Sequence, residues 1–362
     1  MKILYDYQMF SLQKFGGVTR YFCEIMKNFP PEHQFSLSLL FSENHHLKEN
    51  RDVIKKMNIL PGKNFKGKYY IQKSLVAVNR YYSKRAIAKN DFDIFHPTYY
   101  DNYFFDILKK PYVITAHDLI LFKFADTFYK SHTGRPKMEN AIKKANRVIA
   151  ISENTRKDLV EILGIHPEKI DVIYHGYNTI PAKKTGVYGK YILFVGRRNL
   201  YKNFIPFAKA VSKLLNREKD IKLVCVGAPF DKEEMEVLVR SGILDQSVAV
   251  NVDDSFLNGL YAEALAFVFP SLYEGFGMPI LEAFANDCPV CLSNTSCFPE
   301  IAGNGGVYFD PYDQESISKA VEKVVYDSAF AKEIKLAGRQ RLAGFSWKKA
   351  AMETVSSYIK TN

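Results

Sequence analysis

The stretch YEGFGMPILE, residues 273 to 282, places two carboxylates, Glu274 and Glu282, on either side of two glycines and a proline. Proline fits the first turn of a helix, where its missing N–H group costs nothing, and glycine lets a backbone approach a ligand closely. The pattern therefore predicts a helix that begins at about Gly277, with the positive end of its dipole directed at a ligand site. Compensation of the helix dipole accounts for Glu282 alone but not for the whole string.

Short apolar runs on both sides of this stretch predict two parallel sheets. The runs are KILYDY, DIFHP, YVITAHD, RVIAIS and DVIYHG in the first half, and YILFVG, KLVCVG, VAVNV, AFVFPS, PVCLS and GVYFD in the second. Near-continuous apolar runs are typical of parallel strands that are covered on both faces. Helical periods lie between them, most clearly over residues 17–29, and the periodicity breaks at NTIPAKKTGVYG, residues 178–189. The fold class is therefore α/β, with two doubly wound domains.

Length and composition limit the class of protein. With 362 residues, 47% of them apolar, the chain is long enough for two domains with separate cores. No apolar run approaches the roughly 18 to 20 residues that cross a bilayer, and MKILYDY at the start carries no signal-peptide pattern, so we expect a cytoplasmic protein.

Five cysteines, an odd number, argue against a disulfide scaffold. Cys288, Cys291 and Cys297 include one C-x2-C spacing, but CPVCL has the composition of a buried strand and no second ligand pair follows. We interpret these side chains as core thiols and assign no metal to them.

The net charge of +11 is concentrated in the first half of the chain. Residues 1–180 contain 28 Lys and Arg against 18 Asp and Glu. Within them, residues 48–89 contain twelve basic and two acidic residues, interleaved with tyrosines such as Tyr81 and Tyr82. A patch of this kind attracts a polyanion, whether nucleic acid, anionic lipid or a phosphorylated substrate. A solvated helix face accounts for the same residues.

Two loops that follow predicted strands can bind anions, because ligands of doubly wound sheets lie beyond the carboxyl ends of the strands. Gly16 and Gly17 leave backbone N–H groups bare at a helix start, which suits a phosphate, although paired glycines also make simple turns. Arg197, Arg198 and Lys202 share one loop and predict a diphosphate clamp, with a solvated basic loop as the alternative.

The two carboxylates of the opening stretch complement such a clamp. Glu274 is expected in the loop before the helix and Glu282 in its first turns, so they flank the anion site and do not share a face as a metal pair does. At that separation they can accept hydrogen bonds from the hydroxyls of a sugar and of a ribose on either side of a diphosphate.

SLYEGFGMPILEA, with its E-x(7)-E spacing, closely resembles the donor-binding motif of the retaining glycosyltransferases of family 4, which have the GT-B fold. The similarity extends over nearly the whole chain. It rests on the order and spacing of GGVTRY near the start, TAHDL at 115–119, AISENTRKDL at 150–159, VIYHGYN at 172–178, LYAEALAFVFPS at 260–271, PEIAG at 299–303 and FSWKKAA near the end.

The resemblance implies two Rossmann-like domains that face a central cleft. Residues 1–180 would form the acceptor-side domain, with a C-terminal helix at about 345–362 packing back on it. Residues 181–344 would form the domain that binds the nucleotide sugar.

The resemblance also implies the catalytic residues. His117 lines the reaction centre near the transferred sugar, Glu274 contacts that sugar, and Lys202 neutralises the diphosphate together with an arginine. Many members of the family have an Arg-Lys pair where this chain has Tyr201-Lys202, so the arginine partner stays open between two positions. Residues 275–278 would present backbone N–H groups to the sugar and the diphosphate, and Glu282 would contact the ribose. The full set of donor-binding residues implied is Gly17, Arg197, Arg198, Lys202, Gly275, Phe276, Gly277, Met278 and Glu282.

The implied activity is transfer of a sugar from a nucleotide diphosphate sugar, UDP- or GDP-linked, to a glycan or lipid-linked acceptor with retained configuration, in lipopolysaccharide or capsule assembly. Cations and a helix terminus stabilise the departing diphosphate, so neither a metal ion nor a permanently bound cofactor is expected. Asp91 and Asp93 spell the D-x-D of metal-dependent transferases, but they precede a strand and are interpreted as its solvated entrance.

Other classes of protein explain less of the sequence. A GT-B phosphorylase or epimerase could use a similar cleft, but no motif supports a pyridoxal lysine. A non-catalytic protein on a GT-B scaffold that binds anionic lipid or nucleic acid explains the basic half and leaves the two glutamates unexplained. An NAD-linked dehydrogenase lacks the G-x-G-x-x-G turn. We expect no nucleic acid partner.

The basic segment at 71–89 has two open interpretations. An apolar stripe recurs at helical spacing, and cations lie between its members. The stripe is Ile71, Leu75, Val78 and Tyr82, and the cations are Lys73, Arg80, Lys84, Arg85 and Lys89. Facing outward, the helix suits an anionic membrane surface and would make the enzyme peripheral to the inner face of the cytoplasmic membrane. Facing inward, the stripe packs into the domain and the cations only solvate its back.

Overall fold

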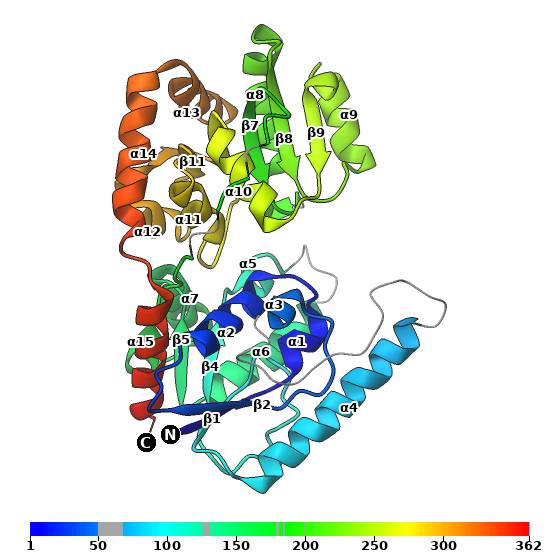
Figure 1. The fold of residues 1–362 in the computed structure, drawn as a ribbon, viewed down its shortest axis with the longest axis vertical. Helices are drawn as coiled ribbons and strands as arrows, with labels where there is room; N and C mark the ends of the chain where they lie inside the picture. Colours follow the sequence, from blue (N-terminus) through cyan, green and yellow to red (C-terminus); the bar gives the residue numbers. More distant parts are fainter. Residues whose placement is uncertain (50–67, 126–130, 179–180, 184, 199, 362) are drawn as a thin grey trace. The chain divides into compact units, whose positions relative to one another are not determined.

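The computed structural model describes residues 1–49, 68–125, 131–178, 181–183, 185–198 and 200–361, and it divides the chain into two compact units. Unit 1 consists of Met1–Gly176 and Trp347–Asn362, and unit 2 of Tyr177–Ser346 (Figure 1). We expected the first boundary between residues 180 and 181, four residues later. Within the described ranges, no helix is both long and apolar enough to cross a membrane.

The sheet of unit 1 is parallel throughout. Its strands are β1 (Lys2–Tyr5), β2 (Gln34–Leu37), β3 (Ile94–His96), β4 (Val113–Ala116), β5 (Arg147–Ala150) and β6 (Ile170–Val172). Hydrogen bonds connect them in the orders β2-β1-β3 and β4-β5-β6, and a parallel bridge from Phe95 to Tyr112 joins the two halves. The strand that follows β1 lies on one side of it, and the strands that follow β3 lie on the other side. The topological switch point of this unit is therefore between β1 and β3.

Unit 1 contains short and long helices, and the one predicted over residues 17–29 is present as α2, which ends at Lys27. They are α1 (Gln8–Leu12), α2 (Gly17–Lys27), α3 (His45–Glu49), α4 (Lys68–Lys89), α5 (Ile120–Lys123), α6 (Ser131–Lys144), α7 (Glu153–Leu163), the 3-10 turn η2 (Pro167–Lys169) and α15 (Trp347–Ile359). In α2, the predicted apolar face is confirmed, since Tyr21, Phe22 and Ile25 are each 1% exposed. Ser152 caps the start of α7, and Gly164 ends it in the left-handed conformation.

Helix α15 belongs to unit 1 although the rest of unit 1 ends some 170 residues earlier in the chain. It packs on α2 and β5 (Figure 1). The Tyr358 hydroxyl lies 2.8 Å from the Tyr5 hydroxyl and 2.7 Å from Nδ1 of His96. Ser357 donates a hydrogen bond of 2.8 Å to Asp171. These contacts are buried or half-buried, so the last helix completes the core of unit 1.

The face through which helix α4 packs combines the polar residues Asn79 and Ser83 with the apolar Ile87, which is 1% exposed. Asn79 is 1% exposed and Ser83 is fully buried; the Asn79 side chain accepts hydrogen bonds from the backbone N–H groups of Leu40 and Phe41. Of the predicted stripe, Val78 is 41% exposed whereas Leu75 and Tyr82 are half-buried, so the stripe packs inward only in part. The side chain of Ile71, and residues 50–67 of the basic segment, lie outside the described residues.

The sheet of unit 2 has the strand order of a Rossmann fold. Its strands are β7 (Lys190–Val195), β8 (Ile221–Val226), β9 (Ser247–Val250), β10 (Ala266–Phe269), β11 (Val290–Ser293) and β12 (Gly306–Phe309). They pair in parallel in the order β12-β11-β10-β7-β8-β9, so the order reverses between β7 and β10. The predicted α/β class with doubly wound domains is confirmed.

Helices cover both faces of this second sheet. They are α8 (Phe204–Arg217), α9 (Lys232–Arg240), α10 (Asp254–Glu263), α11 (Met278–Ala285), α12 (Phe298–Ala302), α13 (Gln314–Tyr326) and α14 (Ser328–Leu342), with 3-10 turns η3 (Leu200–Lys202), η4 (Leu244–Gln246) and η5 (Gly303–Gly305). Strands β10 and β11 are buried at every position, as continuous apolar runs predict.

The cysteines and the D-x-D sequence have structural surroundings. All five cysteines are buried free thiols, which confirms the interpretation of Cys288, Cys291 and Cys297 as core residues. Among the described residues no cluster of His, Cys, Asp or Glu has the geometry of a metal site. Asp91 and Asp93 contact Lys2 at the amino end of β3, with hydrogen bonds of 2.8 Å to its Nζ and backbone N atoms.

Candidate active site

The loops that follow β7 and β10 meet at the switch point of unit 2. The backbone N–H of Leu272 donates a 2.7 Å hydrogen bond to the carbonyl oxygen of Tyr201, which ties the two loops together. Beside this bond, Nζ of Lys202 lies 2.5 Å from Oε1 of Glu274, and each side chain is 16% exposed. The doubly wound topology thus brings together a cation and a carboxylate that are 72 residues apart in the sequence.

The backbone around Glu274 is fixed by Ser296. The Glu274 N–H donates a 3.1 Å hydrogen bond to Oγ of Ser296, and that hydroxyl donates a 2.7 Å bond to the Glu274 carbonyl oxygen. Ser296 itself has a φ of 58°, a left-handed conformation that non-glycine residues rarely adopt. Backbone of this kind recurs at functional sites, and here the residue that adopts it bonds both main-chain polar groups of Glu274.

Helix α11 begins directly after this loop, as the glycine and proline pattern predicts. Gly277 has a φ of 92°, and an added Cβ atom would lie 2.9 Å from Cδ1 of Ile280. Pro279 occupies the first turn. The side chain of Phe276 is 3% exposed and its ring packs at 5.9 Å against Phe345. At this position a ligand can therefore be contacted by backbone groups at the positive end of the helix dipole.

Glu282 lies on α11 itself, on a different element from Glu274. The hydroxyl of Tyr261, in α10, donates a 3.2 Å hydrogen bond to its Oε2 atom. Glu282 is half-buried, so part of the carboxylate can still accept further hydrogen bonds. The two carboxylates of the opening stretch are thus held separately, one by a lysine and one by a tyrosine.

The neighbouring arginines after β7 have opposite surroundings. Arg198 is buried; its Nε atom lies 3.0 Å from Oε1 of Glu234, and its Nη2 atom donates to the carbonyl oxygens of Ala228 and Pro229. Arg197 is exposed. Arg198 therefore has a structural role that holds the loop after β8, and Arg197 is the arginine whose side chain remains at the surface.

The glycine pair of unit 1 lies where the sequence places it, at the start of α2. Gly16 is the N-cap and Gly17 the first helical residue. An added Cβ at Gly16 would collide with the side chain of Gln13, at 2.3 Å from Oε1. An added Cβ at Gly17 would meet no heavy atom within 4 Å. Because the Gln13 side chain is flexible and can move away, packing by itself does not require glycine at either position.

His117 lies at the carboxyl end of β4 in a cluster of rings. The Tyr21 ring packs edge-on at 5.2 Å, and the His175 ring lies at 6.4 Å. Burial lowers the pKa of His117 to about 3, so its imidazole is neutral at pH 7. In the described part of the chain, its buried Nε2 atom has no hydrogen-bond partner. A neutral imidazole suits a hydrogen bond to a ligand and not proton transfer.

Several contacts in these sites could not be found from the sequence. Ser296 and Tyr261 contact the two glutamates, yet each lies about twenty positions away, and nothing in single-letter patterns marks such distant contacts. Trp347 was recognisable as a helix start, but its ring contact with His175, at 5.5 Å, depends on the return of α15 to unit 1.

Comparison with known proteins gives a family for both units. Residues 15–180 match the family described as Glycosyltransferase Family 4, and residues 180–341 match Glycosyl transferases group 1. The O-antigen chain mannosyltransferase RfbU of Salmonella typhimurium is 28% identical over 212 residues, which cover 58% of this chain and 60% of that protein. The O-antigen chain mannosyltransferase B of Escherichia coli is 26% identical over 265 residues, covering 68% of this chain and 69% of that protein.

Solved structures show the same fold. The Anabaena protein Alr3699/HepE, solved in complex with UDP and glucose, superimposes with a TM-score of 0.75 at 16% identity and covers 98% of both chains. Two consecutive family matches spanning residues 15–341, together with this fold, lead to one conclusion: the chain belongs to the group 1 and family 4 glycosyltransferases and has the GT-B fold.

Proposed function

We propose that the chain transfers a hexosyl unit from a nucleotide diphosphate sugar, UDP- or GDP-linked, to a glycan or lipid-linked acceptor in the synthesis of a bacterial surface polysaccharide. The observation that carries the proposal is the pairing of Lys202 with Glu274 beside the start of α11, at the switch point of unit 2. The two O-antigen mannosyltransferases among the relatives favour mannose as the sugar and an O-antigen-like glycan as the product.

The proposed chemistry depends on charge stabilisation. When the bond between sugar and diphosphate breaks, negative charge grows on the departing phosphate oxygens. Lys202, the exposed Arg197 and the backbone N–H groups that begin α11 are suited to that charge, and they stabilise the transition state more than the ground state. Glu274 would accept hydrogen bonds from hydroxyls of the sugar, and Glu282 from the ribose. No second carboxylate is assigned as a covalent nucleophile, and the resemblance to retaining family 4 enzymes favours departure and attack on the same face of the sugar.

The direct test is a screen of sugar nucleotides with the purified chain. Nucleoside diphosphates that bind are expected to raise the melting temperature, since a ligand at 100 times its Kd stabilises by about 2.7 kcal/mol. The matching sugar nucleotide should release its nucleoside diphosphate slowly in water and faster with an acceptor glycan. Turnover of NAD, or absorbance from a bound pyridoxal group, would contradict the proposal.

Gly17→Ala tests the phosphate contact in unit 1. Because the new methyl group meets nothing within 4 Å, and alanine favours helices over glycine, the melting temperature is expected to stay level or rise slightly. Donor KM is expected to increase at least about tenfold, because the methyl group occupies space that the resemblance gives to a phosphate. A lowered melting temperature, or unchanged donor kinetics, would contradict that assignment.

Removal of divalent metal is expected to leave the transfer rate within about threefold, because lysine, arginine and a helix terminus carry out the charge stabilisation. The measurement is transfer in the presence of excess EDTA, compared with added magnesium or manganese. A strict requirement for either ion would contradict the metal-independent mechanism and redirect attention to Asp91 and Asp93.

The outer face of α4 is proposed to bind anionic membrane. Tyr81 is 63% exposed, and Lys84 and Arg85 beside it are exposed as well. Each cation near an anionic lipid surface contributes about 1 kcal/mol at low salt. Reversal of both charges, Lys84→Glu with Arg85→Glu, is therefore expected to weaken binding to phosphatidylserine vesicles by at least about tenfold.

The matched control for that variant is double reversal at Lys348 and Lys349, an exposed pair on α15 of the same unit. This control variant should retain vesicle binding. Vesicle binding by the unmodified chain should be abolished in 1 M salt, because the Debye length falls to about 3 Å. Absence of binding at low salt, or equal binding by the two double variants, would indicate that α4 is an ordinary solvated surface.

A further inference from the structure

Unit 1 contains a cavity of about 430 Å³ at its own topological switch point. Tyr7 and Gln8 line it from the segment after β1, and Tyr99, Tyr100 and Asp101 line it from the segment after β3. Side chains of α4, α5 and α6 complete the wall. The volume lies within the range of small-molecule sites, and doubly wound sheets bind ligands at this place.

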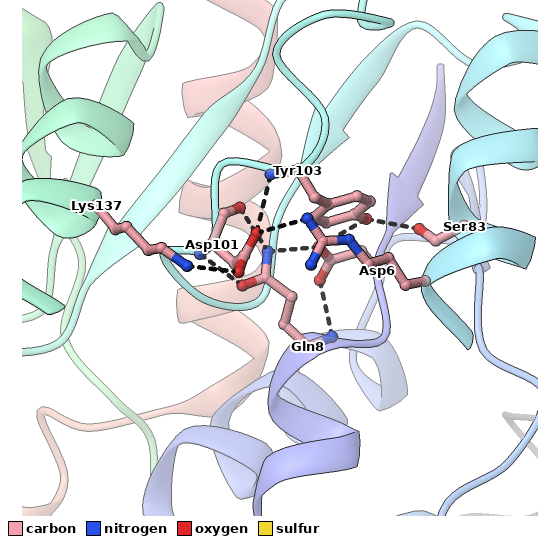
Figure 2. A network of polar contacts seen from close by, with 7 residues as sticks. Asp6, Gln8, Ser83, Asp101, Tyr103 and Lys137 are labelled. Carbon is pink, nitrogen blue, oxygen red and sulfur yellow. Dashed lines mark hydrogen bonds and ion pairs between the residues drawn. The ribbon is translucent and has the colours of Figure 1, made fainter. Parts of the chain in front are cut away.

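A buried carboxylate fixes the two segments that form the cavity. Asp6 is fully buried and accepts a 2.8 Å hydrogen bond from Nε2 of Gln8 and a 3.1 Å bond from the hydroxyl of Tyr103 (Figure 2). It also accepts a 2.8 Å bond from the backbone N–H of Thr98. Both oxygens of this carboxylate accept hydrogen bonds, and the donors come from both segments, so the network ties the two segments together.

The rim of the cavity combines hydrogen-bond donors with an acceptor. Asp101 lies 3.1 Å from Nζ of Lys137 and 3.6 Å from the guanidinium of Arg80, and its backbone N–H donates to Oε1 of Gln8 at 2.8 Å (Figure 2). The Asp101 side chain is still 31% exposed, and those of Arg80 and Lys137 are 46% and 56% exposed. All three can therefore reach a ligand.

The remainder of the wall is aromatic and aliphatic. The rings of Tyr99 and Tyr100 lie 4.7 Å apart at a tilt of 44°, and Val76 and Leu121 contribute apolar surface from α4 and α5. A pyranose ring has an apolar C–H face and a rim of hydroxyls, each both donor and acceptor. Such a ring packs on aromatic side chains while its vicinal hydroxyls bond a carboxylate and its cationic neighbours.

We propose that this cavity binds a neutral pyranose of the acceptor glycan; the inference rests on the proposed transferase function and names its second substrate. A neutral ring can use the Asp101 carboxylate and both cations through its hydroxyls, whereas the same carboxylate would repel an anion. The wall also connects to the expected reaction centre, since the Tyr100 hydroxyl accepts a 3.2 Å hydrogen bond from the backbone N–H of His117.

Binding is tested on the full chain by saturation-transfer NMR with the methyl pyranosides of mannose, glucose and galactose. At least one is expected to bind, and Asp101→Asn and Lys137→Met should each weaken it about tenfold or more. Asparagine preserves the oxygen that accepts the 3.0 Å bond from the Tyr103 N–H, and Lys137 is more than half exposed, so both variants should fold. The matched controls are Asp106→Asn, in the same loop, and Lys143→Met, on the outer face of α6, which should bind normally.

The sign of the Asp101→Asn effect separates a neutral ligand from an anionic one. Loss of the carboxylate weakens binding of a methyl pyranoside but strengthens binding of methyl phosphate, because a repulsive charge disappears. Tighter binding of methyl phosphate by this variant, without pyranoside binding by the wild type, would overturn the inference. So would equal pyranoside binding by the wild type and both cavity variants.

Failure of this inference is distinguishable from failure of the proposed function. A chain that releases nucleoside diphosphate from a sugar nucleotide, yet binds no pyranoside in this cavity, contradicts the inference alone. A chain that binds pyranosides here but neither hydrolyses nor transfers from any sugar nucleotide supports a carbohydrate site and contradicts the transferase.

Discussion

Replacement of Lys202 or Glu274 by alanine is expected to lower kcat for sugar transfer by about 10²- to 10³-fold, because each removes a group aimed at charge or hydroxyls in the transition state. The two side chains lie 2.5 Å apart and are mostly buried, so removal of either also leaves the other without its partner. The measurement is release of nucleoside diphosphate under saturating donor and acceptor, with circular dichroism to confirm folding.

A double variant shows whether the pair works as a unit. If it does, Lys202→Ala with Glu274→Ala should cost little more than the worse single variant. The pair Lys190 and Asp220 is a suitable control: it is 2.8 Å apart and exposed, at the amino end of β7, away from the ligand-binding edge. Lys190→Ala should leave kcat unchanged. Near-normal kcat for either site variant would refute the site assignment.

Arg198→Met is expected to destabilise unit 2 by about 3 to 5 kcal/mol, the effect of breaking a buried ion pair and leaving one charge behind. Arg198 and Glu234 have side chains only 4% and 8% exposed, and the arginine also bonds two backbone carbonyl oxygens. The result should appear as a lower transition temperature for unit 2 in scanning calorimetry, since a two-domain chain need not unfold in one step.

The neighbouring arginine provides the contrast. Arg197→Met removes an exposed charge and should leave the transition of unit 2 within about 0.5 kcal/mol, while it raises the KM for the donor. The single tryptophan, Trp347, is buried in unit 1, so its fluorescence follows that unit separately. Equal stability of the two variants would contradict the structural role of Arg198. A donor defect only in Arg198→Met would contradict the donor-binding role of Arg197.

The elements of the fold were predictable because each is encoded locally. Continuous apolar runs mark strands covered on both faces, and the glycines and proline before α11 mark a helix start, so both follow from residues a few positions apart. The order of strands is not local, yet it decides which loops meet. Only the reversal between β7 and β10 explains why Lys202 meets Glu274.

What sequence reasoning lacked was knowledge of burial at individual positions. Two adjacent arginines are equivalent as letters, but one is buried against a glutamate 36 residues away. In α4 the apolar stripe marked the packed face only in part, because that face combines Ile87 with Asn79 and Ser83, whose side chains bond neighbouring backbone and hydroxyl groups. The Asp6 network was missed for the same reason. A lone acidic residue after a strand is more often exposed to solvent than buried in a hydrogen-bond network.

The return of α15 to unit 1 affects how the chain can fold during translation. A ribosome releases residues 1–176 first, but the groove on α2 and β5 stays open until residues 347–359 emerge. Unit 2 is made without interruption and can therefore complete its fold before unit 1, the reverse of the usual order. Until then, the nascent chain exposes the apolar surface that Trp347 and Tyr358 later cover, so the N-terminal segment cannot complete its core before the last residues are made.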